Sequence, residues 1–288
     1  MSAGEVIHVR RLAHVARRMH TAHVGRRLQR LAQRHLRDGL PQPAVFAFDH
    51  VGMAIALWGR YERDELELLM EALAPRLAPA GVCLDIGANI GNHALFFADH
   101  FAAVLAFEPN PRTYRLLALN AELRPNIRCW NFGLSDADGP ARLAVTADNL
   151  GMATLHGGAG AVVDCELRRL DGLDLLDGQR VALIKIDVEG HEAAVLRGAA
   201  TLLARDRPVV VFEQTAAEIE GGSSAAIELL RQHGYRHFWT FERTPAARWR
   251  WLGLLRRLAF GEVVRLVECS VFEKRFHSMI VALPATAT

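Results

Sequence analysis

From Val82 onward, short apolar runs alternate with longer stretches whose apolar residues recur at helical spacing. Apolar runs of this length are typical of strands buried on both faces, and the helices between them return the chain so that successive strands run parallel. The pattern predicts an α/β fold with a doubly wound, mostly parallel sheet and helices on both of its faces. The expected strands are 82–86, 103–107, 127–133, 181–186, 208–213, 235–241, 264–272 and 279–283, and the expected helices are 92–100, 111–122, one after Gly190, and 223–233.

The first turn of this pattern reads Asp85-Ile-Gly87-Ala-Asn89-Ile-Gly91, and the second strand ends at Glu108. Glycine lets the backbone turn sharply and approach a ligand, and a carboxylate at the end of the second strand can accept both ribose hydroxyls. The glycine fingerprints of dinucleotide sites and phosphate loops do not occur in the sequence. Asp85 favours a cationic ligand over a pyrophosphate, so the turn fits S-adenosylmethionine. The alternative is an ordinary strand-to-helix turn that uses glycine for tightness.

A second group of polar residues follows the later parallel strands. Lys185 and Asp187 end one strand and Glu213 ends the next, at the sheet edge where doubly wound folds bind ligands. Period-two alternation puts Lys185 and Asp187 on one face, and a lysine in an apolar strand is costly to bury unless it is paired. Acidic residues at a helix start are also common because they stabilise the helix N-terminus, which explains Glu189 and Glu192 better than Asp187. The Lys185–Asp187 pair is therefore interpreted as functional.

Composition limits the classes of function. The chain has 288 residues and a net charge of +2, which predicts neither nucleic-acid binding nor an acidic partner. Only two of the 34 basic residues are lysines, so Lys185 stands out. The four cysteines are widely spaced and without a Cys-x-x-Cys pair, which favours reduced core thiols and a cytoplasmic protein. An apolar run of 18 residues and a signal-peptide pattern are both missing, so the protein is expected to be soluble or peripheral to a membrane.

Two basic segments lie outside the alternating pattern. Residues 1–40 carry nine arginines and five histidines against two acids, which predicts a basic amphipathic arm over 1–41 made of one or two helices broken near Gly25. The segment 243–261 interleaves tryptophans with arginines and reads as an insertion in the domain 42–288. Each segment either packs on the domain or contacts a partner such as anionic lipid. Residues 44–58 are predicted to form a short hairpin, 65–77 a helix, and 141–170 short strand-like pieces.

Four stretches together resemble the FkbM family of S-adenosylmethionine-dependent methyltransferases. They are Leu84-Asp-Ile-Gly-Ala-Asn-Ile-Gly91, Ala106-Phe-Glu-Pro-Asn110, Ile184-Lys-Ile-Asp-Val-Glu-Gly-His-Glu192 and Pro208-Val-Val-Val-Phe-Glu213. Shorter pieces, Gly59-Arg-Tyr-Glu62, Asn149-Leu-Gly151 and Leu170-Asp171, also look like that family's pattern. The resemblance covers roughly residues 45–285. It implies a class I methyltransferase fold and methylation of a hydroxyl on a sugar, a glycan or a polyketide-like natural product.

The resemblance also implies roles for the cofactor-side residues. Glu108 is expected to bind the ribose hydroxyls, and the loop with Leu134, Ser135 and Asp136 to contact the adenine. The methionine and ribose side is assigned to the first turn, namely Asp85, Gly87, Asn89 and Gly91.

On the acceptor side, the enzyme must hold a hydroxyl in line with the sulfonium methyl and remove its proton. Positioning contributes about 7 to 11 kcal/mol, and a general base about 10² to 10⁴ in rate. Asp187 is assigned to orienting or deprotonating the hydroxyl, with Lys185 supporting it. His191, whose side chain ordinarily titrates nearest neutrality, and Glu213 are the competing bases.

Other functions fit the sequence less well. Asp187 and Glu213 with Gln214 could gather Mg²⁺, although a site without metal is expected. A nicotinamide oxidoreductase lacks its glycine fingerprint here, and a nucleic-acid amino-methylase lacks both its Pro-Pro-aromatic turn and a basic core. The rival from another class is a non-catalytic binding or membrane-associated protein that retains the fold while its basic arms make the contacts.

Overall fold

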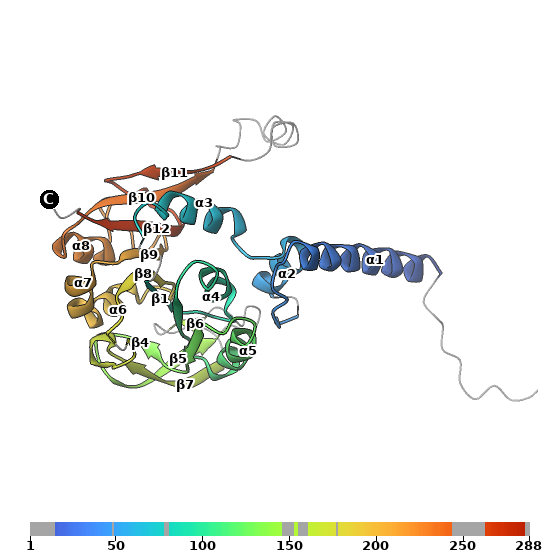
Figure 1. Ribbon diagram of the computed structural model, residues 1–288, viewed down its shortest axis with the longest axis horizontal. Helices are drawn as coiled ribbons and strands as arrows, with labels where there is room; N and C mark the ends of the chain where they lie inside the picture. The colour runs from blue at the N-terminus through green and yellow to red at the C-terminus, as the bar shows by residue number, and fades with distance from the viewer. Residues whose placement is uncertain are drawn as a thin grey trace, which may run out of the picture.

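The fold is seen in a computed structural model, which describes residues 15–47, 49–77, 81–145, 153–154, 161–176, 178–243 and 263–285. The main sheet comprises β1 (Val82–Ile86), β2 (Ala103–Phe107), β3 (Ile127–Trp130), β8 (Val181–Ile186), β9 (Val209–Gln214), β10 (Tyr235–Arg243), β11 (Val264–Glu268) and β12 (His277–Pro284). Their order is β11-β10-β12-β9-β8-β1-β2-β3 (Figure 1). The five strands from β3 to β9 pair in parallel, while β12 is antiparallel to both β9 and β10. The predicted doubly wound, mostly parallel sheet is confirmed.

Helices cover both faces of this sheet because the buried strands present apolar side chains on alternate sides. On one face, α3 (Arg63–Leu73), α4 (Asn92–Phe97) and α5 (Pro111–Ala121) pack on strand residues such as Val104 and Val211. On the other, α6 (Glu192–Gly198), α7 (Ala200–Asp206) and α8 (Ala225–Gln232) pack on Ile184 and Phe212. The single helix expected after Gly190 is thus two helices. The strand expected at 264–272 ends at Glu268.

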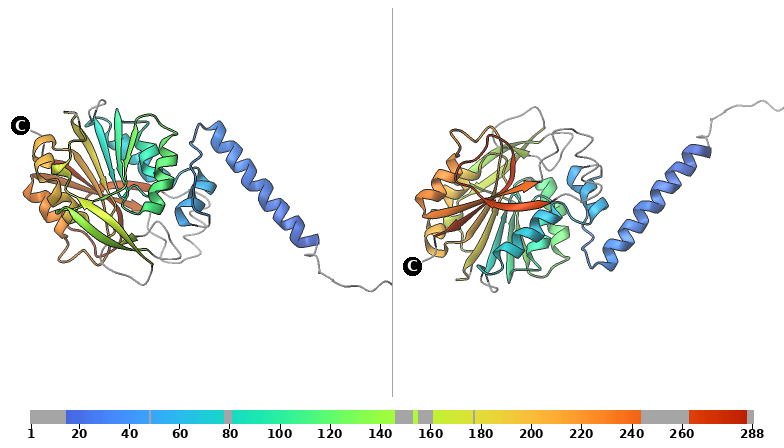
Figure 2. Two further views of the ribbon diagram at one scale, coloured as in Figure 1. Left: turned by 90° about the horizontal axis from the view of Figure 1, so that it is seen from below. Right: turned by 90° about the horizontal axis from the view of Figure 1, so that it is seen from above.

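A second, smaller sheet interrupts the alternation where short strand-like pieces are predicted. It consists of β4 (Gly133–Leu134), β5 (Gly139–Val145), β6 (Ala153–Thr154) and β7 (Ala161–Arg168), in the order β4-β7-β5-β6. Figure 2 shows these strands, coloured green to yellow-green, beside the main sheet. The strand predicted over 127–133 therefore stops at Trp130, and Gly133 belongs to the second sheet. The Asn149–Gly151 stretch lies outside the described residues.

The N-terminal arm is one helix where a break near Gly25 was expected. Helix α1 (Val15–Arg37) runs through that glycine and projects away from the sheet (Figures 1 and 2). One glycine in a helix interior costs only about 1 kcal/mol relative to alanine, which the surrounding arginine, leucine and glutamine residues offset. Residues 1–14 lie outside the described ranges, and of the predicted 243–261 insertion only Arg243 is described.

The hairpin predicted over 44–58 is wrong, because most of this stretch forms α2 (His50–Trp58). The Asp49 side chain caps the helix by accepting a hydrogen bond from the Gly52 amide, 3.3 Å away. Gly59 ends it in the left-handed conformation with φ +81°. Asp before and Gly after an apolar run are helix start and stop signals that outweigh the strand-like composition between them.

Asn120 connects three separate parts of the chain. Its side chain, on α5, accepts a hydrogen bond from the Ala44 amide and donates to the carbonyls of Ala44 and Ile90, at 2.6, 2.9 and 2.7 Å. Asn120 is 1% exposed, and its bond to Ile90 is buried, while the two bonds to Ala44 are partly buried. Asn120 thereby fixes the N-terminal segment and the turn after β1 to the same helix.

We expect Asn120→Ala to lower the free energy of unfolding by about 3 kcal/mol, because two carbonyls and an amide lose their partner and the Ile90 carbonyl stays buried. Urea denaturation of the purified protein measures this change. The matched control is Leu119→Ala on the same helix, where the side chain is exposed and the expected loss is below about 0.5 kcal/mol. Equal losses in the two variants would contradict the role given to Asn120.

Candidate functional site

A cleft of about 410 Å³ opens at the carboxyl ends of β1, β2, β8 and β9. The order of the sheet reverses between β1 and β8, since the chain builds outward to β2 and β3 on one side and to β9 on the other. Doubly wound folds bind ligands at such switch points. The walls include the sequence-predicted residues Gly87, Asn89, Glu108, Asp187, His191 and Glu213.

The first wall of the cleft is the turn after β1. Gly87 has φ +77°, and a Cβ atom there would lie 1.8 Å from the Asp187 carbonyl oxygen, so a side chain is excluded on both counts. Asn89 also takes a left-handed conformation, with φ 51°. Gly91, by contrast, does not line the cleft, and a Cβ there would crowd Leu117 of α5. Gly91 therefore serves the packing of the helices beneath the turn.

Glu108 is fixed at the end of β2. Its two carboxylate oxygens accept hydrogen bonds from the backbone amides of Asn89 at 3.0 Å and Asn110 at 2.8 Å. Burial raises the pKa of this carboxyl to about 7, against the lowering effect of the two amides. The side chain lines the cleft, so its remaining lone pairs are available to a ligand at the place the sequence predicts.

Asp85 lies beneath the cleft instead of on its surface. The residue is fully buried, and neither carboxylate oxygen has a hydrogen-bond partner among the described residues. It is the β1 residue paired with Lys185 in the parallel ladder. Burial raises the pKa of Asp85, and the neighbouring Lys185 charge opposes that rise. The arrangement supports an electrostatic role through Lys185 more directly than contact with a ligand.

The predicted pairing of Lys185 with Asp187 is present. Lys185 is 3% exposed, and its Nζ donates a hydrogen bond to Asp187 Oδ2 at 2.7 Å. Burial lowers the pKa of Lys185, but the carboxylates of Asp187 and Asp85 raise it more, so the net shift is upward and the ammonium stays charged. Asp187 reaches the cleft wall and is partly exposed.

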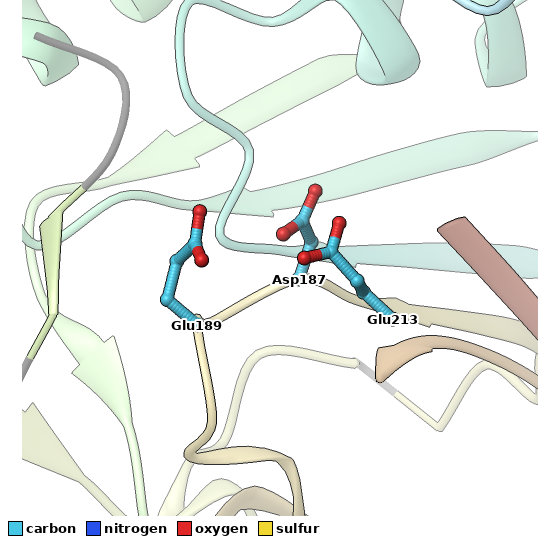
Figure 3. A group of neighbouring side chains, drawn as sticks. All are labelled: Asp187, Glu189 and Glu213. Carbon is cyan, nitrogen blue, oxygen red and sulfur yellow. The ribbon is translucent and has the colours of Figure 1, made fainter. Parts of the chain in front are cut away.

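Three carboxyl groups converge beside this pair (Figure 3). Oxygens of Asp187, Glu189 and Glu213 lie within 4.8 Å of one another. Burial, followed by the charges of Asp187 and Glu189, raises the pKa of Glu213 to about 9, so Glu213 carries a proton at neutral pH. Burial also raises the pKa of Glu189.

Hard oxygen ligands at this spacing suit a divalent cation. Gln214, which the sequence suggested as a ligand together with Asp187 and Glu213, is buried, and its Nε2 donates a hydrogen bond to Glu218 at 2.9 Å. The third oxygen donor of the group is Glu189 instead. The Lys185 ammonium already supplies a positive charge to Asp187.

His191 also lines the cleft and is positioned by Ser135. The Ser135 hydroxyl lies 2.9 Å from His191 Nε2 and 3.3 Å from an oxygen of Asp136. Asp136 itself forms an ion pair with Arg197 at 2.8 Å on the surface. Neither Ser135 nor Asp136 is among the residues that line the cleft, whereas Leu134 of the same loop is, so the contact of this loop with the adenine stays a prediction. Leu134, Leu143 and Leu167 form an apolar part of the cleft wall.

Four aromatic side chains that sequence reasoning did not assign also line the cleft, namely His50, Tyr61, His93 and Phe276. The backbone of Tyr61 is held over the cleft by the Asn92 side chain, which accepts from its amide at 3.0 Å and donates to its carbonyl at 3.1 Å. Tyr61 falls in the Gly59–Glu62 stretch noted in the sequence without a role. Phe276 lies in the turn before β12, where no motif marks it.

The family model described as methyltransferase FkbM domain matches residues 85–237. Hexuronic acid methyltransferase AglP of Haloferax volcanii is 30% identical over 159 residues, which cover 53% of this chain and 62% of AglP. The 31-O-demethyl-FK506 methyltransferase FkbM of Streptomyces tacrolimicus is 29% identical over 237 residues, covering 68% of this chain and 87% of the relative. AMB antimetabolite synthetase AmbE of Pseudomonas aeruginosa is 32% identical over 55% of this chain and 10% of its own length.

The chain thus spans less than two thirds of the length of AglP and a small part of AmbE. Among solved structures, methyltransferase FkbM from Methylobacillus flagellatus KT aligns with a TM-score of 0.43 at 15% identity, covering 88% of this chain and 57% of that one. The family match extends over more than half of the chain, and it contains the turn after β1, Glu108, the Lys185–Asp187 pair and Glu213. The chain therefore belongs to the FkbM methyltransferase family.

Proposed function

We propose that this protein is an S-adenosylmethionine-dependent methyltransferase that methylates a hydroxyl of a sugar, a glycan or a polyketide-like small molecule. The observation that carries the proposal is the cleft at the sheet's switch point, which is lined both by Glu108 and by the carboxyl groups of Asp187 and Glu213. Two relatives support the acceptor class, because one is named a hexuronic acid methyltransferase and the other a 31-O-demethyl-FK506 methyltransferase.

The residues of the cleft fit this cofactor. Glu108 would accept hydrogen bonds from the ribose hydroxyls, and the open backbone at Gly87 and Asn89 would lie against the methionine part. The leucine wall at 134, 143 and 167 would pack on the adenine, and the carboxyl groups would face the cationic end. When bound, the cofactor supplies a methyl group on a sulfonium, which an oxygen nucleophile can take by in-line attack.

Asp187 is the group we assign to orienting and deprotonating the acceptor hydroxyl. Its hydrogen bond to the buried Lys185 fixes one carboxylate oxygen, and the residue lines the cleft. Glu213 carries a proton at neutral pH, so it would donate a hydrogen bond and must lose that proton before it could act as a base. His191, which is hydrogen-bonded to Ser135 and also lines the cleft, is the remaining candidate base.

We expect Glu108→Ala to weaken S-adenosylmethionine binding at least about ten-fold, because a buried pair of ribose contacts worth about 1.5 to 3 kcal/mol would be lost. Isothermal titration calorimetry measures the dissociation constant. Glu122→Ala removes an exposed glutamate after α5 and serves as the matched control, with unchanged affinity. Wild-type protein that fails to bind the cofactor would overturn the proposed function.

For Asp187→Asn, we expect turnover to fall about 10² to 10⁴-fold while cofactor affinity changes less than about three-fold, because the lost group acts on the acceptor. Cofactor affinity also reports that the variant is folded. Asp174→Asn, at an exposed position, is the control and should keep full turnover.

The pH dependence of turnover distinguishes between Asp187 and Glu213 as the general base. If Glu213 were the base, only its ionised fraction would be active, and turnover would rise about ten-fold per pH unit toward its pKa of about 9. We expect that turnover does not rise in this way, because we assign Asp187 as the base. A ten-fold rise per unit that disappears in Glu213→Gln would transfer the role of base to Glu213.

A second proposal concerns α1, which we infer to be a surface for anionic lipid. Arg26, Arg30 and Arg34 lie on one side of the helix, and Val24 and Leu28 lie on the other, at about 100° per residue. Acidic residues are absent from α1, and the side chains of Val24 and Leu28 are exposed. Helices with basic residues on one side and apolar residues on the other lie flat in the interface between membrane and water. Within the described ranges, no helix has the length and apolar character needed to span a bilayer.

We expect the protein to co-sediment with vesicles of phosphatidylcholine containing 30% phosphatidylserine more than with phosphatidylcholine alone. Arg26→Glu with Arg30→Glu should weaken this binding about ten-fold or more, since each basic residue near an anionic surface contributes about 1 kcal/mol. The control with the same charge change is Arg236→Glu with Arg265→Glu, at exposed positions of β10 and β11. Equal sedimentation with both kinds of vesicle would exclude this surface.

A further inference from the structure

A second and wider cleft, of about 1320 Å³, opens next to the cofactor cleft. It lies between the helices α2 and α3 and the strands β10 and β12, elements that come from opposite ends of the chain (Figure 1). His50, Tyr61 and Phe276 line both clefts, so the two clefts are neighbours that share these aromatic side chains. A molecule in the wide cleft would therefore lie next to the cofactor cleft, whose lining includes Asp187 and Glu213.

Two large aromatic side chains of the wide cleft are exposed to solvent. Trp58, at the end of α2, is 64% exposed, and Phe276 is 54% exposed. Flat aromatic rings bind the C–H face of a sugar ring, while polar neighbours bind its hydroxyls, because an aromatic ring offers an apolar, weakly negative face. Neither ring is needed to fill the core, so their place at this cleft is explained best by contact with a ligand.

The charges of the wide cleft disfavour an anionic ligand. Its arginines are held by carboxylates: Arg63 contacts Glu67 at 2.7 Å, Arg275 contacts Glu273 at 3.2 Å, Arg243 contacts Glu65, and Arg60 contacts Asp99 at 4.0 Å. Acidic residues also outnumber the arginines in its lining, which contains Glu62, Asp64, Glu65, Glu67, Glu242 and Glu273. An anionic group would have to displace one of these carboxylates from its arginine and would meet the others as like charges.

We propose that the wide cleft is the acceptor subsite and that it binds a glycosyl unit without an acidic group, stacked on Trp58 and Phe276 with its hydroxyls toward the carboxylates. The inference rests on the proposed methyltransferase function and adds the location and the charge of the acceptor. The acceptor of this chain would carry no acidic group, whereas AglP is named a hexuronic acid methyltransferase.

Two probes that differ only at the sixth carbon test the charge. Methyl β-D-glucopyranoside and methyl β-D-glucuronide are titrated into the full chain saturated with S-adenosylmethionine, with ligand-observed NMR giving the dissociation constants. We expect the glucoside to bind at least ten-fold more tightly than the glucuronide. Asp64→Asn with Glu242→Gln should reduce that ratio. A glucuronide that binds as tightly as the glucoside, or a glucoside that does not bind, would overturn the proposal.

The stacking contact is tested separately. Trp58→Ala should raise the dissociation constant of the glucoside about ten-fold, Trp58→Phe should restore most of the affinity, and Leu119→Ala on α5 should have no effect. Cofactor affinity, measured by calorimetry on the same samples, should be equal in all four proteins. An unchanged glucoside affinity in Trp58→Ala contradicts the subsite. Absence of cofactor binding in the wild type would instead reject the methyltransferase function, so the two failures are distinguishable.

Discussion

The buried ammonium of Lys185 is the interaction on which the site depends. It lies on a central strand between two carboxylates, Asp85 on the neighbouring strand and Asp187 at the strand's end. Removing one partner of a buried ion pair costs about 3 to 5 kcal/mol, because an uncompensated charge stays behind. The lysine therefore constrains the adjoining ends of β1 and β8 to one arrangement. The positive charge of Lys185 offsets the repulsion between the carboxylates that lie close to it.

Backbone contacts reinforce that arrangement. The Asp187 amide donates to the Ile86 carbonyl at 2.9 Å, and the missing side chain of Gly87 lets the Asp187 carbonyl approach. The turn that would hold the cofactor and the loop that carries the acceptor-side carboxylate are thus in direct contact. Positioning of two reactants relative to each other is the largest contribution a site of this kind can make, and it requires such rigidity.

Much of this arrangement could be predicted from the sequence, because buried parallel strands and glycine turns leave strong local patterns. The sheet, the place of Glu108 and the Lys185–Asp187 contact all followed from alternation and burial. Helix α2 was mistaken for a hairpin, since its apolar run hid the signals at Asp49 and Gly59. The roles of Ser135, Tyr61 and Phe276 depend on contacts between distant segments, which no spacing in the chain records. Asp85 was placed on the right strand, but its depth beneath the cleft is a property of the folded sheet.

The two clefts are built from different parts of the chain, and this division affects how the protein can diverge. Walls of the cofactor cleft come mainly from residues 86–215, whereas the wide cleft is built from residues 50–67 and 240–279. Mutations in these flanking stretches can alter what is recognised without disturbing the central strands. A gene duplicate could therefore acquire a new acceptor through changes in these two stretches, while the residues of the cofactor cleft stay the same.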